Sequence, residues 1–324
     1  MIGFDYIIAE TVSGFDAILN PFELYTLPLD DWIAIAVEFV VDNFRPLFQA
    51  IRVPVELVLN SIESLFIAIP PLIFIVVLGL ITWQIGGRAI AIYAILTLTF
   101  IGFLGIWKAA MVTLSLVLTA VILCAIVGIP VGILAAKNDR IDRGLRPLLD
   151  TMQTLPAFVY LVPVVMLFGI GRVPGTIATF IFAVPPLIRL TNLGIRQVSP
   201  EAVEAAIAFG STPRQILWNV QLPLSLPAIL TGMNQAIVLA LSMSVIASMI
   251  AVEGLGQLVL QGVGRLDVGL AAVGGLGIVL IAILLDRIAT AIAESGESWR
   301  DRGIIKLLSR HRKRSQDAIN YSSR

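Results

Sequence analysis

The sequence predicts an all-α, polytopic membrane helix bundle, and three observations lead to that fold class. First, 58% of the 324 residues are hydrophobic and only 14% are charged, whereas soluble domains carry about 25% charged residues. Second, the mean hydropathy is +0.94. Third, apolar segments of membrane-spanning length, roughly twenty residues each, recur along the chain and are separated by short polar segments.

Seven apolar segments are expected to cross the membrane as helices. They are residues 66–85, 88–107, 109–136, 152–170, 174–195, 223–250 and 269–292. Ahead of them, residues 29–64 are acidic and amphipathic, which is typical of a helix that lies on the membrane surface. The chain is therefore divided into four regions: an acidic extracytoplasmic or interfacial region at 1–65, two additional spans at 66–107, a core at 108–292 and a basic tail at 293–324.

The distribution of charge predicts how the chain is oriented. Residues 1–65 carry ten Asp or Glu but only two Arg, and the residues after Trp299 carry eight Lys or Arg. Since cytoplasmic segments of membrane proteins are enriched in Lys and Arg, we expect the N-terminus outside and the C-terminus in the cytoplasm of a bacterial-type inner (plasma) membrane. This orientation places most of the remaining cations on the cytoplasmic side: Arg88, Lys137, Arg140, Arg143, Arg146, Arg189, Arg196 and Arg214.

Residues that carry out catalysis or bind metals are scarce. The one cysteine, Cys124, lies inside an apolar segment, and the one histidine, His311, lies in the basic tail, so no disulfide, metal site or acid–base centre is predicted. The sequence contains no P-loop of the pattern GxxxxGK[ST], so no cofactor or nucleotide is expected to bind this chain. The charge asymmetry concerns membrane orientation, so no nucleic-acid partner is expected either.

A polar, helix-forming segment separates the last two apolar segments from those before them. Its caps and breakers predict two short helices joined by a bend. These residues are Ser199 as the first cap, Pro200 and Glu201 in the first turn, Gly210 as the stop, Ser211 or Thr212 as the second cap, and Pro213 as the second start. Two short helices at an angle form a compact knob, and on a membrane protein such a knob predicts docking to a soluble partner.

The spacing within this segment is similar to that of the cytoplasmic coupling loop of ABC importer permeases. The pattern is Glu204-Ala205-Ala206, three residues, Gly210, nine residues, Val220, one residue, and Leu222-Pro223. Val220 stands where that family usually has Ile. The resemblance implies that residues 199–223 contact an ATPase, through Glu204, Ala205, Ala206, Gly210, Pro213, Arg214, Val220, Leu222 and Pro223. The alternative is an ordinary amphipathic loop helix.

Three further segments narrow the resemblance. Residues 154–171, 182–191 and 245–269 resemble the permeases of glycine betaine/proline importers, the ProW and OpuA type. That resemblance implies a MetI-like type I ABC importer transmembrane domain, with a five-span core preceded by two extra spans and an amphipathic scaffold helix. It also implies the partners: a separate ABC ATPase that binds ATP and Mg²⁺, a second permease copy in a homodimer, an extracytoplasmic substrate-binding protein and membrane lipid.

The implied function is the import of compatible solutes, foremost glycine betaine and otherwise proline betaine or proline. The chain forms the translocation pathway and is not itself an enzyme, because ATP hydrolysis belongs to the ATPase. One alternative keeps the ABC permease and changes the cargo to another quaternary amine or an amino acid. A secondary transporter or channel is a further alternative, but no ionisable residue is expected at the bilayer midplane, where a coupling ion would bind. A membrane-embedded enzyme would need a catalytic constellation that the sequence lacks.

Overall fold

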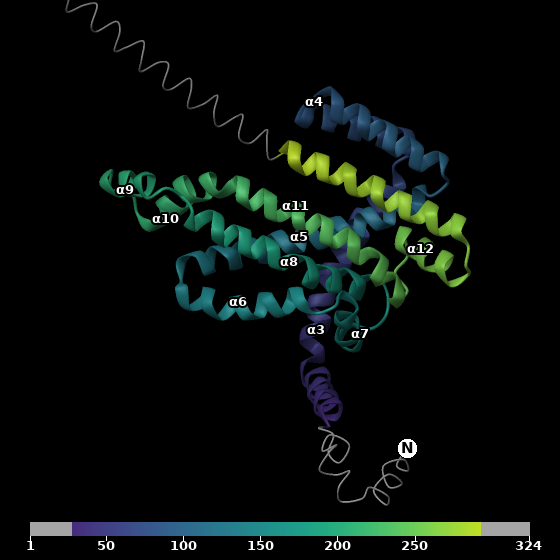
Figure 1. Ribbon diagram of the computed structural model, residues 1–324, viewed down its shortest axis with the longest axis horizontal. Helices are drawn as coiled ribbons and strands as arrows, with labels where there is room; N and C mark the ends of the chain where they lie inside the picture. Colours follow the sequence, from purple (N-terminus) through teal and green to yellow (C-terminus); the bar gives the residue numbers. More distant parts are fainter. Residues whose placement is uncertain (1–27, 293–324) are drawn as a thin grey trace, which may run out of the picture. The chain divides into compact units, whose positions relative to one another are not determined.

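The computed structural model describes residues 28–292, and within that range every regular element is a helix (Figure 1). An all-helical fold suits a bilayer, because a helix satisfies its backbone hydrogen bonds internally where no water is available. The segment before residue 28 and the basic tail after residue 292, which includes His311, lie outside the described residues.

The chain divides into two compact units, residues 1–48 and 49–324. Helix α3 (Leu29–Ala68) begins in the first unit and continues into the second. In the first unit its exposed side chains include large apolar ones, such as Trp32 and Phe39, beside acidic ones such as Asp31. This mixture is expected of an interfacial helix, and the location of α3 at a membrane surface stays a prediction.

Helix α4 (Pro71–Phe103) is broken and reversed at Gly87. Gly87 has φ 79° and ψ −172°, a backbone conformation that is open mainly to glycine. A Cβ atom on Gly79 would lie 2.9 Å from Cγ1 of Ile95, yet in a continuous helix these two residues would be about 24 Å apart. The two halves of α4 therefore lie against each other as an antiparallel hairpin, and its turn falls between the segments predicted as spans 66–85 and 88–107.

Three long apolar helices form the centre of the second unit: α5 (Trp107–Lys137), α8 (Arg172–Arg196) and α11 (Leu222–Ala247). They pack closely because glycine residues occupy the positions at which the helix backbones come into contact. A Cβ atom on Gly132 of α5 would lie 2.9 Å from the carbonyl oxygen of Ile188 in α8, and one on Gly232 of α11 would lie 3.1 Å from Cα of Leu187. Small residues at helix contacts are the usual means of close packing in membranes.

The segment predicted as one straight span at 152–170 is not a single helix. Its place is taken by helix α6 (Asp139–Thr154), the 3-10 helix η2 (Ala157–Tyr160) and helix α7 (Leu161–Phe168). The chain bends by 108° between α6 and the η2–α7 pair. Pro156 accounts for the break, because it has no N–H to donate to the carbonyl of Met152. The hydroxyl of Tyr160 donates to that carbonyl instead.

Three elements follow α11: the 3-10 helix η4 (Ser248–Ile250), helix α12 (Leu255–Gly264) and the last described helix, Val268–Ile292. The N–H of Leu255 donates to Oγ1 of Thr113 at 2.8 Å, which holds α12 against the beginning of α5. The last described helix contacts α11, where Nδ2 of Asn234 donates to Oδ1 of Asp286 at 2.7 Å.

By length and composition, five helices among the described residues are able to cross a membrane, or six if the bent pair of α6 and η2–α7 counts as one span. That count treats α4 as one helix. Counting the two halves of its hairpin separately adds one crossing and gives the seven that the sequence predicts. That each half of α4 crosses the membrane stays a prediction.

Candidate functional site

The polar segment 199–223, which we call the coupling loop, folds as two short helices beyond the ends of α8 and α11 (Figure 1). The first is α9 (Pro200–Ala208), and Ser199 occupies its N-cap position. The sequence predicts a capping hydrogen bond from Ser199, but its hydroxyl makes none. Pro200 at the first turn and Glu201 near the positive end of the helix dipole still favour a helix start there.

Gly210 ends α9 in a left-handed conformation, with φ 78°. The N–H of Gly210 donates to the carbonyl of Ile207 at 2.8 Å, and the N–H of Ser211 donates to the carbonyl of Ala206 at 3.0 Å. These bonds satisfy carbonyls that have no donor within the helix. No atom would lie within 4 Å of a Cβ atom at Gly210, so glycine is required there by the backbone conformation rather than by space.

The second helix, α10 (Pro213–Ile216), begins with a capping box. The N–H of Thr212 donates to Oε1 of Gln215 at 2.8 Å, and the N–H of Gln215 donates to Oγ1 of Thr212 at 3.4 Å, so two orphan donors are satisfied reciprocally. A π-helical turn, η3 (Leu217–Gln221), joins α10 directly to α11. The second half of the coupling loop is therefore a continuation of α11, whereas the first half is joined to it through Gly210.

Most residues predicted to contact an ATPase are exposed. Glu204, Ala205, Gly210, Pro213, Arg214 and Pro223 are exposed, and Ala206, Val220 and Leu222 are half-buried. Three large apolar side chains that the sequence reasoning did not single out are exposed as well: Ile207 by 58%, Phe209 by 90% and Trp218 by 66%. Their signal in the sequence is the presence of large apolar residues in a polar loop, since exposed apolar surface marks interaction sites.

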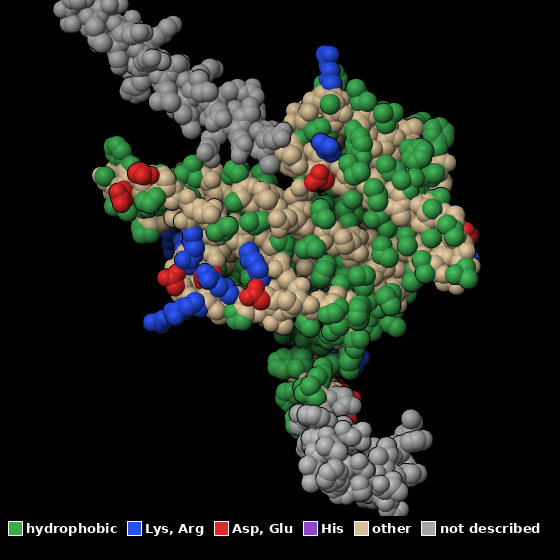
Figure 2. All heavy atoms as spheres, in the orientation of Figure 1, with side chains coloured by type: hydrophobic (Ala, Val, Ile, Leu, Met, Phe, Trp, Pro, Cys, Tyr) green, Lys and Arg blue, Asp and Glu red, His purple; other side chains and the backbone are tan. Residues whose placement is uncertain are grey.

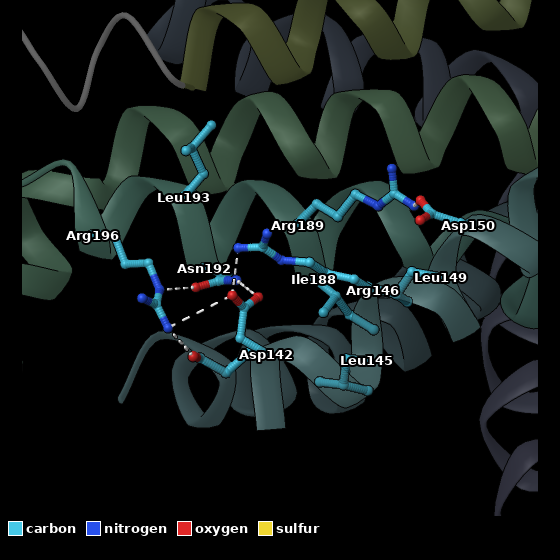
Figure 3. Close-up of a pocket in the computed structure, with 11 residues that line it drawn as sticks. Asp142, Leu145, Arg146, Leu149, Asp150, Ile188, Arg189, Asn192, Leu193 and Arg196 are labelled. Carbon is cyan, nitrogen blue, oxygen red and sulfur yellow. Dashed lines mark hydrogen bonds and ion pairs between the residues drawn. The ribbon is translucent and has the colours of Figure 1, made fainter. Parts of the chain in front are cut away.

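A buried carboxylate beside the coupling loop connects α6 to α8 (Figure 3). The side chain of Asp142 in α6 is only 7% exposed. It accepts from Nη2 of Arg146 at 2.6 Å and from Nδ2 of Asn192 in α8 at 2.7 Å, and Nη2 of Arg196 lies 3.9 Å from Oδ2 of Asp142. Burial of a charge is tolerated when it is paired and hydrogen-bonded, and Asp142 meets that condition.

The guanidinium of Arg196 joins the ends of three helices. Its Nη2 lies 2.8 Å from Oδ1 of Asp139, the first residue of α6, and donates to the carbonyl of Ala135 in the last turn of α5 at 2.8 Å. Its Nε donates to Oδ1 of Asn192 at 2.8 Å. We call the side chains of Asp139, Asp142, Arg146, Asn192 and Arg196 the Asp142 network.

A cavity of about 330 Å³ lies between α6 and α8 beside this network. Apolar side chains such as Leu145 and Leu149 line part of it, and Arg189 is paired with Asp150 at its rim (Figure 3). In the space-filling view, Lys and Arg side chains gather here beside Asp and Glu (Figure 2).

The sequence reasoning treated the arginines as orientation signals and missed Asp142 and Asn192. Asp142 and Arg146 are four residues apart on a helix, a spacing that favours an ion pair. That spacing is the signal by which the sequence could have indicated Asp142.

Across residues 28–292, the His, Cys, Asp and Glu side chains form no group of three or more that could hold a metal ion. The coupling loop presents an exposed surface of apolar side chains together with Glu204 and Arg214. The Asp142 network joins the ends of α5, α6 and α8 through hydrogen bonds and ion pairs, and its Arg196 precedes the coupling loop by three residues. An exposed apolar surface of this kind suits docking to a partner.

Residues 128–295, a little over half of the chain, match the family model described as "binding-protein-dependent transport system inner membrane component". The chain is 53% identical to the glycine betaine/proline betaine transport system permease protein ProW of Escherichia coli, over 93% of this chain and 86% of that protein. It is 44% identical to the glycine betaine/carnitine transport permease protein GbuB of Listeria monocytogenes, over 84% of this chain and 98% of that protein.

Among solved structures, an inward-facing MetNI methionine ABC transporter is similar to this chain with a TM-score of 0.55. The likeness covers 59% of this chain and 95% of that chain at 20% identity, so it shows a shared fold and nothing more specific. The predicted MetI-like fold is thereby confirmed. The family match extends from the second half of α5 to the end of the described residues and includes the whole coupling loop. The chain therefore belongs to the family of binding-protein-dependent transport system inner membrane components, which are multi-pass permease subunits of ABC importers.

Proposed function

We propose that this chain is the translocation subunit of an ATP-driven importer for glycine betaine and closely related betaines. The observation that carries the proposal is the 53% identity, across 93% of the chain, to a permease named for glycine betaine and proline betaine. Other relatives are named for carnitine or trimethylamine N-oxide. All of these cargoes carry a fully substituted, positively charged nitrogen, so the chemical class is shared even where the solute differs.

The coupling loop is the proposed contact with a separate ATPase, which binds ATP and Mg²⁺. Support comes from the exposure of Glu204 and Ala205 and from the exposed side chains of Phe209 and Trp218. An interface of this kind gains most of its free energy from a few buried aromatic side chains. Glu204 adds a negative charge that suits a basic groove on the partner.

The proposed orientation places the coupling loop in the cytoplasm and the N-terminus outside. Arg196 contacts the carbonyl of Ala135, so the cationic corner between α5 and α6 lies at the same end of the molecule as the coupling loop. A Cβ atom on Gly86 would lie 2.8 Å from Cβ of Ala291, so the turn of the α4 hairpin lies beside the end of the last described helix. The proposed orientation puts both of these cationic segments at the cytoplasmic face, in line with the positive-inside rule.

Two cations that the proposed orientation leaves outside, Arg52 and Arg172, contact the region where α7 ends and α8 begins. Arg172 at the start of α8 is paired with Glu63, and Nη1 of Arg52 donates to the carbonyl of Phe168 at 3.3 Å. A substrate-binding protein would deliver the solute at the outer face, and a second permease copy would complete the pathway. Recognition of the quaternary ammonium by an aromatic cage is assigned to the binding protein rather than to this chain.

The test is uptake of radiolabelled glycine betaine into lipid vesicles that contain this chain, its ATPase and its substrate-binding protein. We expect uptake that requires ATP and the binding protein and that is competed by proline betaine. If uptake persists without the ATPase, the proposal is wrong and the chain functions as a secondary transporter. No ATP-dependent uptake of any betaine would overturn it.

Carnitine is the second candidate cargo, because the permease that is 44% identical over 84% of this chain is named for glycine betaine and carnitine. The same vesicles separate the two candidates. Competition by unlabelled carnitine at the concentration that suffices for glycine betaine would favour a shared carrier, and competition only at far higher concentration would restrict the cargo to betaines. Proline and choline in the same panel test the remaining amino-acid and quaternary-amine alternatives.

A further inference from the structure

Arg196 lies where the coupling loop joins the helix bundle. It is the last residue of α8, and α9 begins at Pro200. The residues between them, 197–199, are uncharged. Along the chain, Arg196 is therefore the charged side chain of the bundle nearest to the start of α9, and it contacts the ends of α5 and α6 at Ala135 and Asp139.

The contacts of α8 with α5 and with α6 differ in kind. Gly132 of α5 lies so close to α8 that a Cβ atom there would be 2.6 Å from Cβ of Thr191, so these two helices are held by dense packing. Helix α6 is joined to the same end of α8 through Asp142, Asn192 and Arg196, beside a cavity of about 330 Å³. Close-packed surfaces resist displacement, whereas a few hydrogen bonds beside open space can separate and re-form.

Asp142 retains a charge partner even if α8 moves away. Arg146 is on the same helix, four residues further along, and its Nη2 lies 2.6 Å from Oδ2 of Asp142. Without this partner, loss of Asn192 and Arg196 would leave a buried carboxylate uncompensated, which is strongly unfavourable. Arg146 therefore makes two arrangements accessible: one in which Asp142 is shared by α6 and α8, and one in which it is held by α6 alone.

We propose that the Asp142 network positions α6 against α8 according to the place of the coupling loop, with Asp142 and Arg196 as the two positioning residues. The proposal rests on the coupling loop being the ATPase contact. Helix α6 continues through the 108° bend into η2 and α7, so a movement of α6 also moves the broken span. In this proposal both positioning residues act through the placement of helices.

The test uses the assembled transporter, with its ATPase and substrate-binding protein, in lipid vesicles. Asp142→Asn keeps the shape of the side chain and removes its charge. Arg196→Lys keeps the charge but lacks the planar fork that reaches Asp139, Asn192 and the Ala135 carbonyl together. The matched control is Arg140→Gln, because Arg140 is an exposed cation of α6 that forms no ion pair among the described residues. Each variant is measured for bound ATPase, ATP hydrolysis and solute imported per ATP.

A second readout does not depend on the cargo. Spin labels are placed at Leu148 of α6 and Leu193 of α8, both of them exposed, in a chain whose Cys124 is replaced by Ala. We expect the distance between the labels to differ between the nucleotide-free and the ATP-trapped complex. In Asp142→Asn and Arg196→Lys this nucleotide effect should be lost, while Arg140→Gln should retain it.

We expect both variants to bind the ATPase and to hydrolyse ATP, while the solute imported per ATP falls about fivefold or more, the lower end of couplings between distant sites. The double variant should be no worse than the more affected single one, since both residues act in one network. An unchanged ratio of solute to ATP, or a nucleotide-dependent distance that persists in both variants, would overturn the proposal. So would a loss of thermal stability with a normal ratio in the complexes that assemble.

If Asp142→Asn does not assemble, Arg196→Lys decides by the same criteria. A parent complex that shows the nucleotide-dependent distance but imports no betaine contradicts the proposed cargo and leaves the network supported. A parent complex with no change in that distance contradicts the network whatever the cargo is.

Discussion

Gly210 and Gly132 are both required as glycines, for opposite physical reasons. Gly210 has φ 78° and open space around the position of a Cβ atom. Gly132 is helical, and a Cβ atom there would meet Thr191 and the carbonyl oxygen of Ile188 at less than 3 Å. The first glycine is needed for its backbone conformation and the second for the close approach of two helices. Substitutions at Gly210 should therefore affect coupling, and substitutions at Gly132 should affect the stability of the bundle.

Substitution of Gly210 should affect coupling and leave the fold intact. Gly210→Ala adds the cost of a left-handed conformation, about 1–2 kcal/mol. Gly210→Pro cannot adopt that conformation and also removes the N–H that donates to Ile207. Ala205→Asp leaves the backbone unchanged and adds a second carboxylate beside Glu204. We expect normal membrane insertion in all three and less ATPase association, with proline worse than alanine. Normal solute uptake in Gly210→Pro and Ala205→Asp would remove the coupling loop as the ATPase contact.

Substitution of Gly132 should destabilise the bundle itself. Gly132→Val would force α5 and α8 apart, and overpacking of this kind costs about 1–3 kcal/mol. Gly144→Ala in α6 is the matched control, because no atom would lie within 4 Å of its Cβ; it should be neutral or stabilising by about 0.5–1 kcal/mol. The measurement is the thermal unfolding midpoint of the purified permease. Equal midpoints for Gly132→Val and the parent would contradict the close packing.

At the scale of elements, the last described helix is joined to α11 by a polar pair that the sequence does not indicate. Nδ2 of Asn234, which lies about 18 Å along α11 from Leu222, donates to the carboxylate of Asp286. Ionisable residues within apolar helices are normally paired with a neighbouring helix.

Loss of one member of this pair should cost more than loss of both. Asp286→Leu leaves the Asn234 amide without its acceptor, and an unpaired buried polar group costs about 1–3 kcal/mol. Replacement of both residues by Leu removes donor and acceptor together and should be close to neutral. A double-mutant cycle on the unfolding midpoint checks this, with Asn234→Leu as the other single variant. Strict additivity of the two single effects would show that the hydrogen bond contributes nothing to stability.

At the scale of the whole molecule, the number of crossings decides on which side each terminus lies. We propose that two cationic segments lie at the cytoplasmic face: the corner where Arg196 contacts Ala135, and the turn at Gly86 beside Ala291. With the bent pair of α6 and η2–α7 counted as one span, separate crossing of the two halves of α4 gives an odd number of crossings, and the termini lie on opposite sides. If α4 instead crosses once, that number is even and the termini lie on the same side.

Cysteine labelling in a Cys124→Ala background distinguishes these cases. We expect Arg88→Cys, beside the turn of the α4 hairpin, and Ser315→Cys to react with a membrane-impermeant reagent only from the cytoplasmic face. Ser13→Cys should react only from the outside. Protection of position 88 from both sides would mean that α4 crosses as one helix, and labelling of positions 13 and 315 from the same side would reject the proposed orientation.

The fold class, the family and the two short helices within residues 199–223 could be predicted from the sequence alone, because these depend on local signals. Hydropathy reports membrane helices, and caps and breakers such as Thr212 and Gly210 act within a few residues. The tertiary structure decided features that depend on distant residues. These are the reversal at Gly87, the bend that breaks the 152–170 segment, and the meeting of Asp142 with Asn192 and Arg196. A hydropathy pattern records how apolar a segment is but not the direction in which the chain continues. A carboxylate in a charged segment does not by itself reveal which helix will cover it.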